Sequence, residues 1–322
     1  MLPPKDRLNI CFAHVAYRLQ ERFEARRTGI RSFEVRAPEA LDGVIGDADV
    51  LVVSGMWRND LIERAPKLRF IQSISAGTDQ YSREALRARA IRLASAQGAN
   101  ARAVAEHAMS LILALARRLP EARDNQAKHF WRGMIGDLDR REDELGGKTL
   151  LIIGLGRIGG RLAQLATAFD MRVRGIRRDP AAGKNNADSV HGMNELHALL
   201  PEADVVALTC PLTPETQGIV NTSTLGAMKR SAYLINVARG RCVDEPALIE
   251  AIEHARIAGA GLDCSVEEPL APSSPLWNFE NVLVTPHTAG ETRKYEENVL
   301  DLLMENLARL WRGETALRNQ IV

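Results

Sequence analysis

The chain has 322 residues, too many for one small domain, and at roughly 150 residues per domain its length predicts two. It carries 42 Lys and Arg against 41 Asp and Glu, so its formal net charge of +1 gives no global attraction to nucleic acid or acidic lipid. Hydrophobic residues make up 45% and charged residues 26%, which is typical of a globular chain and excludes a disordered one.

The sequence shows no membrane span and no export signal. The most apolar long segment, 103–119, contains Glu106, His107, Arg117 and Arg118, whereas a span needs roughly 18 uninterrupted apolar residues. The N-terminal MLPPKDRLNICFAHV lacks a small-residue cleavage site behind a longer apolar region. We therefore expect a cytoplasmic protein with neither a membrane nor a nucleic acid as its partner.

The cysteines predict neither a disulfide framework nor a zinc site, because they lie far apart and none forms a C-x-x-C pair. A reducing compartment and no bound metal are expected. The four are Cys11, Cys210, Cys242 and Cys264.

Short β-rich segments alternate with helical segments along the whole chain, which is the βαβ pattern. Several, such as TLLIIG and DVVALT, are continuously apolar, as expected for parallel strands covered by helices on both faces. We predict two open, doubly wound parallel sheets. Strands are expected at 8–12, 50–53, 68–74, 149–153, 173–176, 205–208, 233–237, 259–262 and 282–284.

Two long helical segments suggest how the domains connect. The segment 100–119 opens after the turn at Gly98, is expected to end at Pro120, and is predicted to link the domains. The polar segment 121–147 that follows contains Phe130 and Trp131, a composition suited to docking on another surface. The amphipathic segment 291–311 is predicted to return the chain to the first domain.

A strand, a glycine-rich turn and a helix follow one another from residue 149. The strand TLLIIG runs into GLGRIG, with Gly154, Gly156 and Gly159, and then into RLAQLATAF. Such glycines permit a tight turn, close approach of backbone N–H groups to a pyrophosphate and close helix packing, and the helix N-terminus adds partial positive charge. The pattern predicts a dinucleotide-binding turn; a purely structural glycine-rich turn is the alternative.

The end of the next strand bears on the choice of cofactor. In NAD-binding units a carboxylate about 20 positions on holds the ribose 2′-hydroxyl, but here MRVRGI is followed by Arg177, Arg178 and Asp179. Guanidinium groups bind a 2′-phosphate by charged, bidentate hydrogen bonds, whereas a carboxylate repels it. The arginines favour NADP(H). NAD(H) is the alternative, with solvated arginines and Asp179 on the ribose.

Three later segments place candidate catalytic groups after strand ends. Arg239 in INVARG suits a substrate carboxylate, Glu268 lies in GLDCSVEEPL and His287 lies in VTPHTAG. A carboxylate beside a histidine stabilises the imidazolium, so a pair of Glu268 and His287 can present a proton near neutral pH. Each residue alone has a structural alternative: a surface ion pair for Arg239, a turn cap for Glu268, and for His287 the fact that it is one of seven histidines.

The ordered set of segments resembles the D-isomer-specific 2-hydroxyacid dehydrogenases, in particular members of the glyoxylate/hydroxypyruvate reductase type. The resemblance implies a flavodoxin-like substrate domain of residues 1–99 and 290–322, a Rossmann-type NAD(P)-binding domain of residues 100–289 inserted into it, and an active site in the cleft between them. The segments are SAGTDQ, NARAVAEHAMSLILALAR, LGGKTLLIIGLGRIG, TCPLTPET, INVARG, LDCSVEEPL, PLWNFENVLVTPHTAG and GETALRNQIV.

Site residues follow from the same resemblance. Arg239 would bind the substrate carboxylate and carbonyl, His287 would be the acid/base, and Glu268 would orient and charge it. Backbone amides around Ala76 and Gly77 would bind the other side of the carboxylate. The residues expected to line the cofactor, among which Asp263 would steer the nicotinamide end, are Gly154, Gly156, Arg157, Ile158, Gly159, Arg177, Arg178, Cys210, Ala238, Asp263 and Gly290.

Two positions depart from the common family pattern. Arg177 stands where the family usually has a ribose-binding Asp, which supports NADP(H), and Cys264 and Ser265 stand where Val and Phe are more frequent. The second departure alters packing and leaves Glu268 in place.

The expected function is hydride transfer between NADP(H) and a small 2-oxo acid such as glyoxylate or hydroxypyruvate, giving a D-2-hydroxy acid, by a homodimeric enzyme. A noncatalytic, NAD(P)-sensing protein of the corepressor kind is the alternative from another class, and the intact catalytic set argues against it. Phosphoglycerate oxidation is a further alternative, although the chain ends at Val322 without the added regulatory domain often found with it. Formate or phosphite oxidation is the last.

Overall fold

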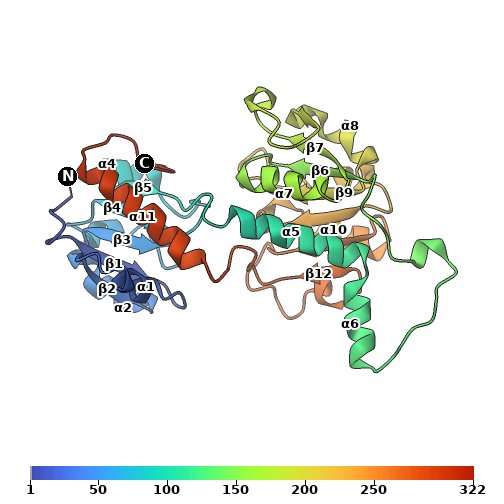
Figure 1. Cartoon of the computed structure of the whole chain (residues 1–322), viewed down its shortest axis with the longest axis horizontal. Coiled ribbons are helices and arrows are strands. Elements are labelled where there is room, and N and C mark those ends of the chain that lie inside the picture. Colours follow the sequence, from blue (N-terminus) through green and yellow to red (C-terminus); the bar gives the residue numbers. More distant parts are fainter. Residues whose placement is uncertain (1) are drawn as a thin grey trace. The chain divides into compact units, whose positions relative to one another are not determined.

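The structure, a computed structural model, describes residues 2–322 except for the side chain at position 139. The chain divides into two compact units (Figure 1). Unit 1 is the chain up to Asn100 together with Glu291–Val322, and unit 2 is Ala101–Gly290. In the chain, unit 2 is inserted between the two parts of unit 1.

Unit 1 is built on a five-stranded sheet of order β2-β1-β3-β4-β5. All of its ladders are parallel, and with the strands in chain order this is the flavodoxin-like arrangement. The strands are β1 Asn9–Ala13, β2 Arg31–Val35, β3 Val50–Val53, β4 Phe70–Ser73 and β5 Arg92–Ala94. The helices are α1 Leu19–Ala25, α2 Pro38–Val44, α3 Leu61–Arg64, α4 Arg83–Ala88 and α11 Tyr295–Trp311.

Both faces of this sheet are buried, which explains the continuously apolar strands. In β3 Val50 and Val52 join the core beneath α1 and α11, while Leu51 and Val53 join the core beneath α2, α3 and α4. In Figure 1 the red α11 lies across the strands of its unit. The C-terminal helix therefore completes unit 1, as predicted, although it begins at Tyr295, four residues later than expected.

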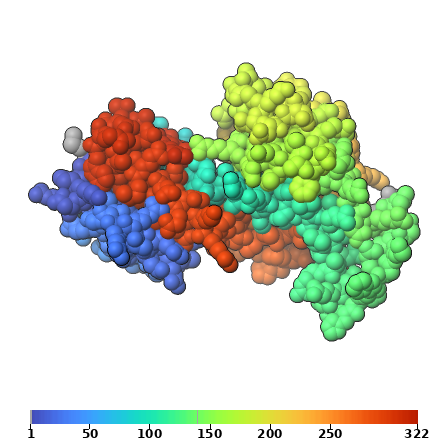
Figure 2. All heavy atoms as spheres, in the orientation of Figure 1, coloured from blue at the N-terminus to red at the C-terminus, as the bar shows by residue number. Residues whose placement is uncertain are grey.

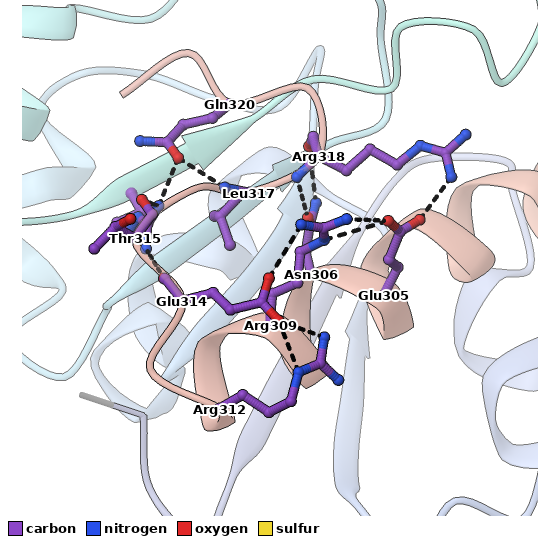
Figure 3. Close-up of polar contacts among 10 residues, drawn as sticks. Glu305, Asn306, Arg309, Arg312, Glu314, Thr315, Leu317, Arg318 and Gln320 are labelled. Atoms are coloured by element: carbon purple, nitrogen blue, oxygen red, sulfur yellow. Dashed lines mark hydrogen bonds and ion pairs between the residues drawn. The ribbon is translucent and has the colours of Figure 1, made fainter.

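Polar contacts fasten the C-terminal segment to α11 (Figure 3). The buried Asn306 side chain donates to Gln72 Oε1 at 3.0 Å and to the Arg318 carbonyl at 3.2 Å, and it accepts from the Arg318 N–H at 2.8 Å. Glu305 pairs with Arg318 at 2.7 Å, and Glu314 pairs with Arg309 at 3.1 Å. These bonds join α11, the C-terminal segment and β4 into one body.

Unit 2 contains a seven-stranded parallel sheet of order β12-β11-β10-β9-β6-β7-β8. From β8 to β11 this is the 3-2-1-4-5-6 order of dinucleotide-binding folds, with β12 added. The strands are β6 Thr149–Ile153, β7 Arg172–Ile176, β8 Ser189–His191, β9 Val205–Leu208, β10 Tyr233–Asn236, β11 Gly259–Leu262 and β12 Val282–Val284. The helices are α5 Ala101–Ala116, α6 Leu119–Ala127, α7 Arg157–Thr167, α8 Leu196–Leu199, α9 Thr222–Ala227 and α10 Glu245–Glu253.

Two helical layers enclose this sheet as well. Leu150 and Ile152 of β6 pack beneath α5 and α7, and Leu151 and Ile153 pack beneath α8, α9 and α10. The predicted fold class, two doubly wound α/β domains, is confirmed. Among the residues that the structure describes, no helix is long and apolar enough to cross a membrane.

The predicted helix 100–119 is wrong at its C-terminal end. Helix α5 ends at Ala116, Arg118 has a left-handed backbone with φ +50°, and α6 then begins at Leu119 with Pro120 in its first turn. Proline has no N–H to donate, and at the start of a helix that donor is not needed. Pro120 therefore opens a second helix instead of following the end of the first.

Three strands were not expected: β2, β5 and β8. Each lies at an edge of its sheet. Their sequences are RSFEV, RLA and SVH, and none is a continuous apolar run.

Candidate active site

The predicted site residues of unit 2 lie at the ends of its strands. Because every ladder is parallel, the carboxyl ends of the strands share one edge of the sheet, where ligands bind in open α/β folds. The residues within three positions of a strand end there are Gly154 after β6, Arg177 after β7, Cys210 after β9, Ala238 and Arg239 after β10, Asp263 after β11 and His287 after β12.

Each glycine of the turn after β6 has a distinct role. Gly154 has φ +104°, and a Cβ there would lie 2.5 Å from the Cys210 nitrogen. A Cβ on Gly159 would lie 2.5 Å from the Gly154 carbonyl oxygen and 2.8 Å from Thr209 Oγ1. Both positions therefore exclude a side chain, the first for the turn and the second for the packing of α7 on the sheet.

Gly156 differs, because a Cβ there would meet no protein atom within 4 Å. It is the N-cap of α7 and, like Arg157, is exposed. Protein packing does not require this glycine, whereas close approach of a pyrophosphate to the helix N-terminus does. The turn fits a dinucleotide, which Gly154, Gly156, Arg157, Ile158 and Gly159 would hold.

The segment after β7 carries the two predicted arginines. Arg177 is half-buried and donates to the Gly183 carbonyl at 2.9 Å, while Arg178 is exposed. Asp179 Oδ1 accepts from the Ala181 N–H at 3.0 Å and so caps the short turn Pro180–Ala182. One oxygen of the alternative ribose ligand is thus already engaged.

Two asparagines pack this basic segment against the glycine-rich turn. Asn185 Nδ2 donates to the Leu155 carbonyl and Asn186 Nδ2 to the Gly160 carbonyl, each at 3.0 Å. Lys184 lies directly before them. These hydrogen bonds hold the segment that carries the three basic residues 177, 178 and 184 against the glycine-rich turn.

Cys210 lies behind the turn and is buried with Cys242. Its hydrogen bond with Cys242, together with burial, raises the pKa of Cys210, and the same hydrogen bond lowers the pKa of Cys242. Burial raises the pKa of Cys264, the departure from the family pattern, whose thiol faces the Asn236 carbonyl at 3.8 Å. Cys264 thus fills core space.

Arg239 begins the turn Gly240–Cys242 and is half-buried. One guanidinium nitrogen donates to the Ala238 carbonyl at 2.7 Å, and Asn236 Nδ2 donates to the Arg239 carbonyl at 2.9 Å. A Cβ on the following Gly240 would lie 1.9 Å from the Ser265 carbonyl oxygen. The absence of that atom lets the Arg239 turn pack against the loop that carries Glu268.

Glu268 and His287 form the predicted pair. Glu268 Oε2 lies 2.8 Å from His287 Nδ1, and Glu268 Oε1 accepts from the Ser265 N–H at 3.2 Å. The two side chains are 41% and 46% exposed, so solvent and a ligand can reach them. His287 itself has a left-handed backbone with φ +55°, uncommon for a residue other than glycine.

Asp263 is 2% exposed and both its oxygens accept hydrogen bonds. Oδ1 accepts from Thr285 Oγ1 at 2.7 Å and from the Thr288 N–H at 3.0 Å, and Oδ2 accepts from the Ala289 N–H at 3.0 Å. His107 Nε2 of α5 lies 2.9 Å from Thr285 Oγ1. The expectation that Asp263 lines the cofactor stays a prediction, as does the one for Gly290, which ends this loop.

Ala76 and Gly77, the predicted substrate-binding residues, belong to unit 1. They follow β4, and polar contacts join this segment to the end of β3. Ser75 Oγ lies 2.6 Å from Ser54 Oγ, which also accepts from Gln80 Nε2 at 3.1 Å. Ala76 is exposed and Gly77 is partly exposed. Their contact with a substrate stays a prediction.

The sequence interpretation missed His107 and Thr285 as parts of the site. The available signal was a single histidine on a largely apolar helix, and its partners, 156 and 178 positions away, come together only through the fold. Among the described residues, no group of three or more His, Cys, Asp or Glu is placed to hold a metal ion.

This architecture and this edge of the sheet are those of NAD(P)-dependent oxidoreductases. The sequence model of the D-isomer specific 2-hydroxyacid dehydrogenase NAD-binding domain matches residues 109–289. The chain belongs to the D-isomer specific 2-hydroxyacid dehydrogenase family.

Individual relatives span several named activities. The glyoxylate/hydroxypyruvate reductase B of Enterobacter sp. (strain 638) is 36% identical over 298 residues, which are 92% of this chain and 91% of that protein. The D-3-phosphoglycerate dehydrogenase of Methanocaldococcus jannaschii is 37% identical over 279 residues, 84% of this chain, and this match spans about half of that protein, 51%. The crystal structure of the TT0316 protein from Thermus thermophilus has a TM-score of 0.84 and 33% identity, covering 98% of this chain and 100% of that one.

Proposed function

We propose that this protein reduces a small 2-oxo acid, such as glyoxylate or hydroxypyruvate, to the D-2-hydroxy acid with NADP(H). The observation that carries the proposal is the contact between Glu268 and His287, on the same sheet edge as Arg239 and the glycine-rich turn. The similarity to a glyoxylate/hydroxypyruvate reductase over nine-tenths of both chains supports the substrate class.

Each side chain has a defined task in this reaction. The nicotinamide supplies a hydride to the carbonyl carbon when the cofactor is bound. Glu268 holds His287 Nδ1, so proton delivery to the carbonyl oxygen falls to Nε2 of the protonated imidazole. Arg239 binds the carboxylate and stabilises the developing charge on the oxygen. Loss of one such electrostatic donor typically costs about 2.7–4 kcal/mol of transition-state stabilisation.

The preference for NADP(H) rests on the segment after β7. Arg177, Arg178 and Lys184 outnumber the single carboxylate of Asp179 there, and Asp179 caps a turn. This clustering of positive charge suits the 2′-phosphate.

Steady-state assays with NADPH and NADH test the substrate and cofactor together. The 2-oxo acid panel contains glyoxylate, hydroxypyruvate and larger homologues, and 3-phosphoglycerate and formate are assayed in the oxidative direction. Turnover confined to one of the last two, or none at all, contradicts the proposal. Arg177→Asp should move the preference toward NADH, whereas Arg172→Asp, an exposed arginine at the opposite end of β7, should not. A higher kcat/KM with NADH in the unmodified protein contradicts the role of Arg177.

Replacing His287 tests the acid/base role. General acid–base catalysis typically contributes about 100- to 10,000-fold, so His287→Ala should lower kcat by at least about 100-fold and leave the cofactor Kd nearly unchanged. An exposed histidine of the same unit, His254, provides the control substitution. Unchanged turnover in His287→Ala removes this residue from the role.

We also propose that the protein is a homodimer joined through the segment 117–142. Helix α6 has no buried residue, and large apolar side chains after it are exposed, among them Phe130 at 59%, Trp131 at 96% and Met134 at 103%. They border a hollow of about 670 Å³ that is lined by residues of this segment. The segment itself is the green projection of unit 2 in Figure 2. Exposed apolar surface of this kind marks contact sites.

Light scattering in solution tests the assembly. The protein should have a mass of about twice 35.5 kDa, and combining Trp131→Ser with Met134→Ser should yield the monomer. Trp277→Ser is the matched control, because Trp277 is also exposed in unit 2, at 52%, but lies outside this segment. A monomeric mass for the unmodified protein contradicts the proposal.

A further inference from the structure

His107 belongs to a chain of hydrogen bonds that ends on the loop carrying His287. Its Nε2 lies 2.9 Å from Thr285 Oγ1 and 3.5 Å from Asp263 Oδ1. Its side chain is 22% exposed and that of Asp263 is 3% exposed, so the contact is largely shielded from water. The mechanism proposed above does not use His107.

The direction of each bond in this chain follows from the carboxylate. Asp263 is an acceptor, so the single hydroxyl proton of Thr285 goes to Oδ1 at 2.7 Å. The Thr285 oxygen is then left as an acceptor, which requires His107 Nε2 to carry a proton and donate it. His107 therefore acts as a fixed N–H donor, and a neutral imidazole with its proton on Nε2 is sufficient.

The backbone of the catalytic loop is the other end of the chain. Asp263 accepts the N–H groups of Thr288 and Ala289, the two residues after His287. His287 itself has a left-handed backbone, which is uncommon for a residue other than glycine. Two backbone hydrogen bonds to one buried carboxylate hold the residues that directly follow His287.

The packing of α5 on β11 places His107 at this carboxylate. Gly261 of β11 faces Leu111 of α5, where a Cβ would lie 3.0 Å from the Leu111 Cβ, so the glycine lets the helix approach closely. His107 precedes Leu111 by four helical residues, about 6 Å, and Asp263 follows Gly261 by two strand residues, about 6.6 Å. The two spacings match, and the histidine meets the carboxylate beyond the strand end.

We infer that His107 is a positioning residue: through Thr285 and Asp263 it holds the loop of His287 in the conformation in which the imidazole faces Glu268. This inference rests on the proposed role of His287. It assigns to α5, the first helix of unit 2, a part in the geometry of the acid/base.

Three variants test the inference: His107→Leu removes the donor, His107→Gln restores an N–H near the position of Nε2 without a titrating group, and His254→Leu removes an exposed histidine of the same unit. We expect His107→Leu to lower kcat by about tenfold or more, because small misplacements of a reacting group are costly. His107→Gln should stay within about threefold of the unmodified protein, and His254→Leu should match it. Cofactor Kd should change less than twofold in all three.

A second readout needs no turnover. In the protein without cofactor, 15N spectra of the histidine rings should show His107 protonated on Nε2. The His287 signals are assigned by their loss in His287→Ala. They should shift in His107→Leu but not in His107→Gln or His254→Leu. Unmoved His287 signals and unchanged kcat in His107→Leu overturn the inference, as do equal losses in the Leu and Gln variants. If His287→Ala itself keeps full activity, the proposed acid/base role fails, which is a separate result.

Discussion

Gly240→Ala should separate the two loops that carry Arg239 and Glu268. In the structure a Cβ at Gly240 would lie 1.9 Å from the Ser265 carbonyl oxygen, 2.0 Å from its carbon and 2.5 Å from the Val266 nitrogen. All three are backbone atoms, so no side chain can swing aside. Ordinary contact begins at 3.4 Å, and one loop must therefore move by about 1.5 Å.

That displacement sets the expected magnitudes. A misplacement of about 1 Å can cost about 100-fold in rate, or roughly 2.7 kcal/mol at 1.36 kcal/mol per factor of ten. We therefore expect kcat/KM for the preferred 2-oxo acid to fall by about 100-fold or more. Overpacking typically costs about 1–3 kcal/mol, which for a unit of this size lowers Tm by roughly 2–12 °C.

Gly226→Ala is the matched control, because a Cβ at Gly226 in α9 meets no atom within 4 Å. It should keep kcat/KM and leave Tm unchanged or slightly raised. Kinetics, thermal unfolding and cofactor titration of both variants give the comparison. If Gly240→Ala matches Gly226→Ala in kcat/KM and Tm, the reasoning from loop contact is refuted.

Three further outcomes follow from other parts of the structure. Asn306→Ala removes a buried amide that bonds Gln72 and Arg318, so the free energy of unfolding of unit 1, measured by urea titration, should fall by about 2–4 kcal/mol; a loss below about 0.5 kcal/mol contradicts this. Burial raises the pKa of Asp204 but hydrogen bonds from Lys229 and the Thr149 N–H outweigh it, so the folded-state pKa lies below 3.8. The stability that this lowered pKa contributes is present above the unfolded-state pKa and is lost as the pH falls through the folded-state pKa. Tm should therefore decrease as the pH is lowered below about 4, and it should decrease less in Lys229→Met. An equal decrease in both proteins contradicts this prediction. Burial raises the pKa of Cys11 to about 12, so mass spectrometry should find it unalkylated in the folded protein at pH 8 and modified after unfolding, and rapid labelling of the folded protein would contradict its burial.

Much of the fold could be predicted from the sequence because its inner strands are buried on both faces. Strands β3, β6, β9, β11 and β12 have the residues expected for them. The first four lie inside their sheets, and β12 is an edge strand whose sequence, VLV, is nevertheless a continuous apolar run. The strands that were missed, β2, β5 and β8, are edge strands, where half-exposed polar residues interrupt the apolar run. The prediction detected continuous apolar runs, and three of the four edge strands lack one.

The candidate site also contains residues that could be predicted from the sequence and features that could not. Gly154, Arg239, Glu268 and His287 could be found because each follows a strand end, a local feature of the chain. Pro120 misled the prediction, since a proline just after one helix and a proline in the first turn of the next helix look alike in sequence.

The sequence by itself determined the two-sheet α/β class and the glycine-rich turn, because these depend on residues near one another in the chain. It also predicted that Glu268 and His287, 19 positions apart, are in contact. Only the tertiary structure decided that Gly240 lets the Arg239 turn reach the loop of Glu268, and that Gly261 lets α5 bring His107 to Asp263. The physical reason is that close approach depends on atoms that are absent from two glycines and on partners far away in the chain.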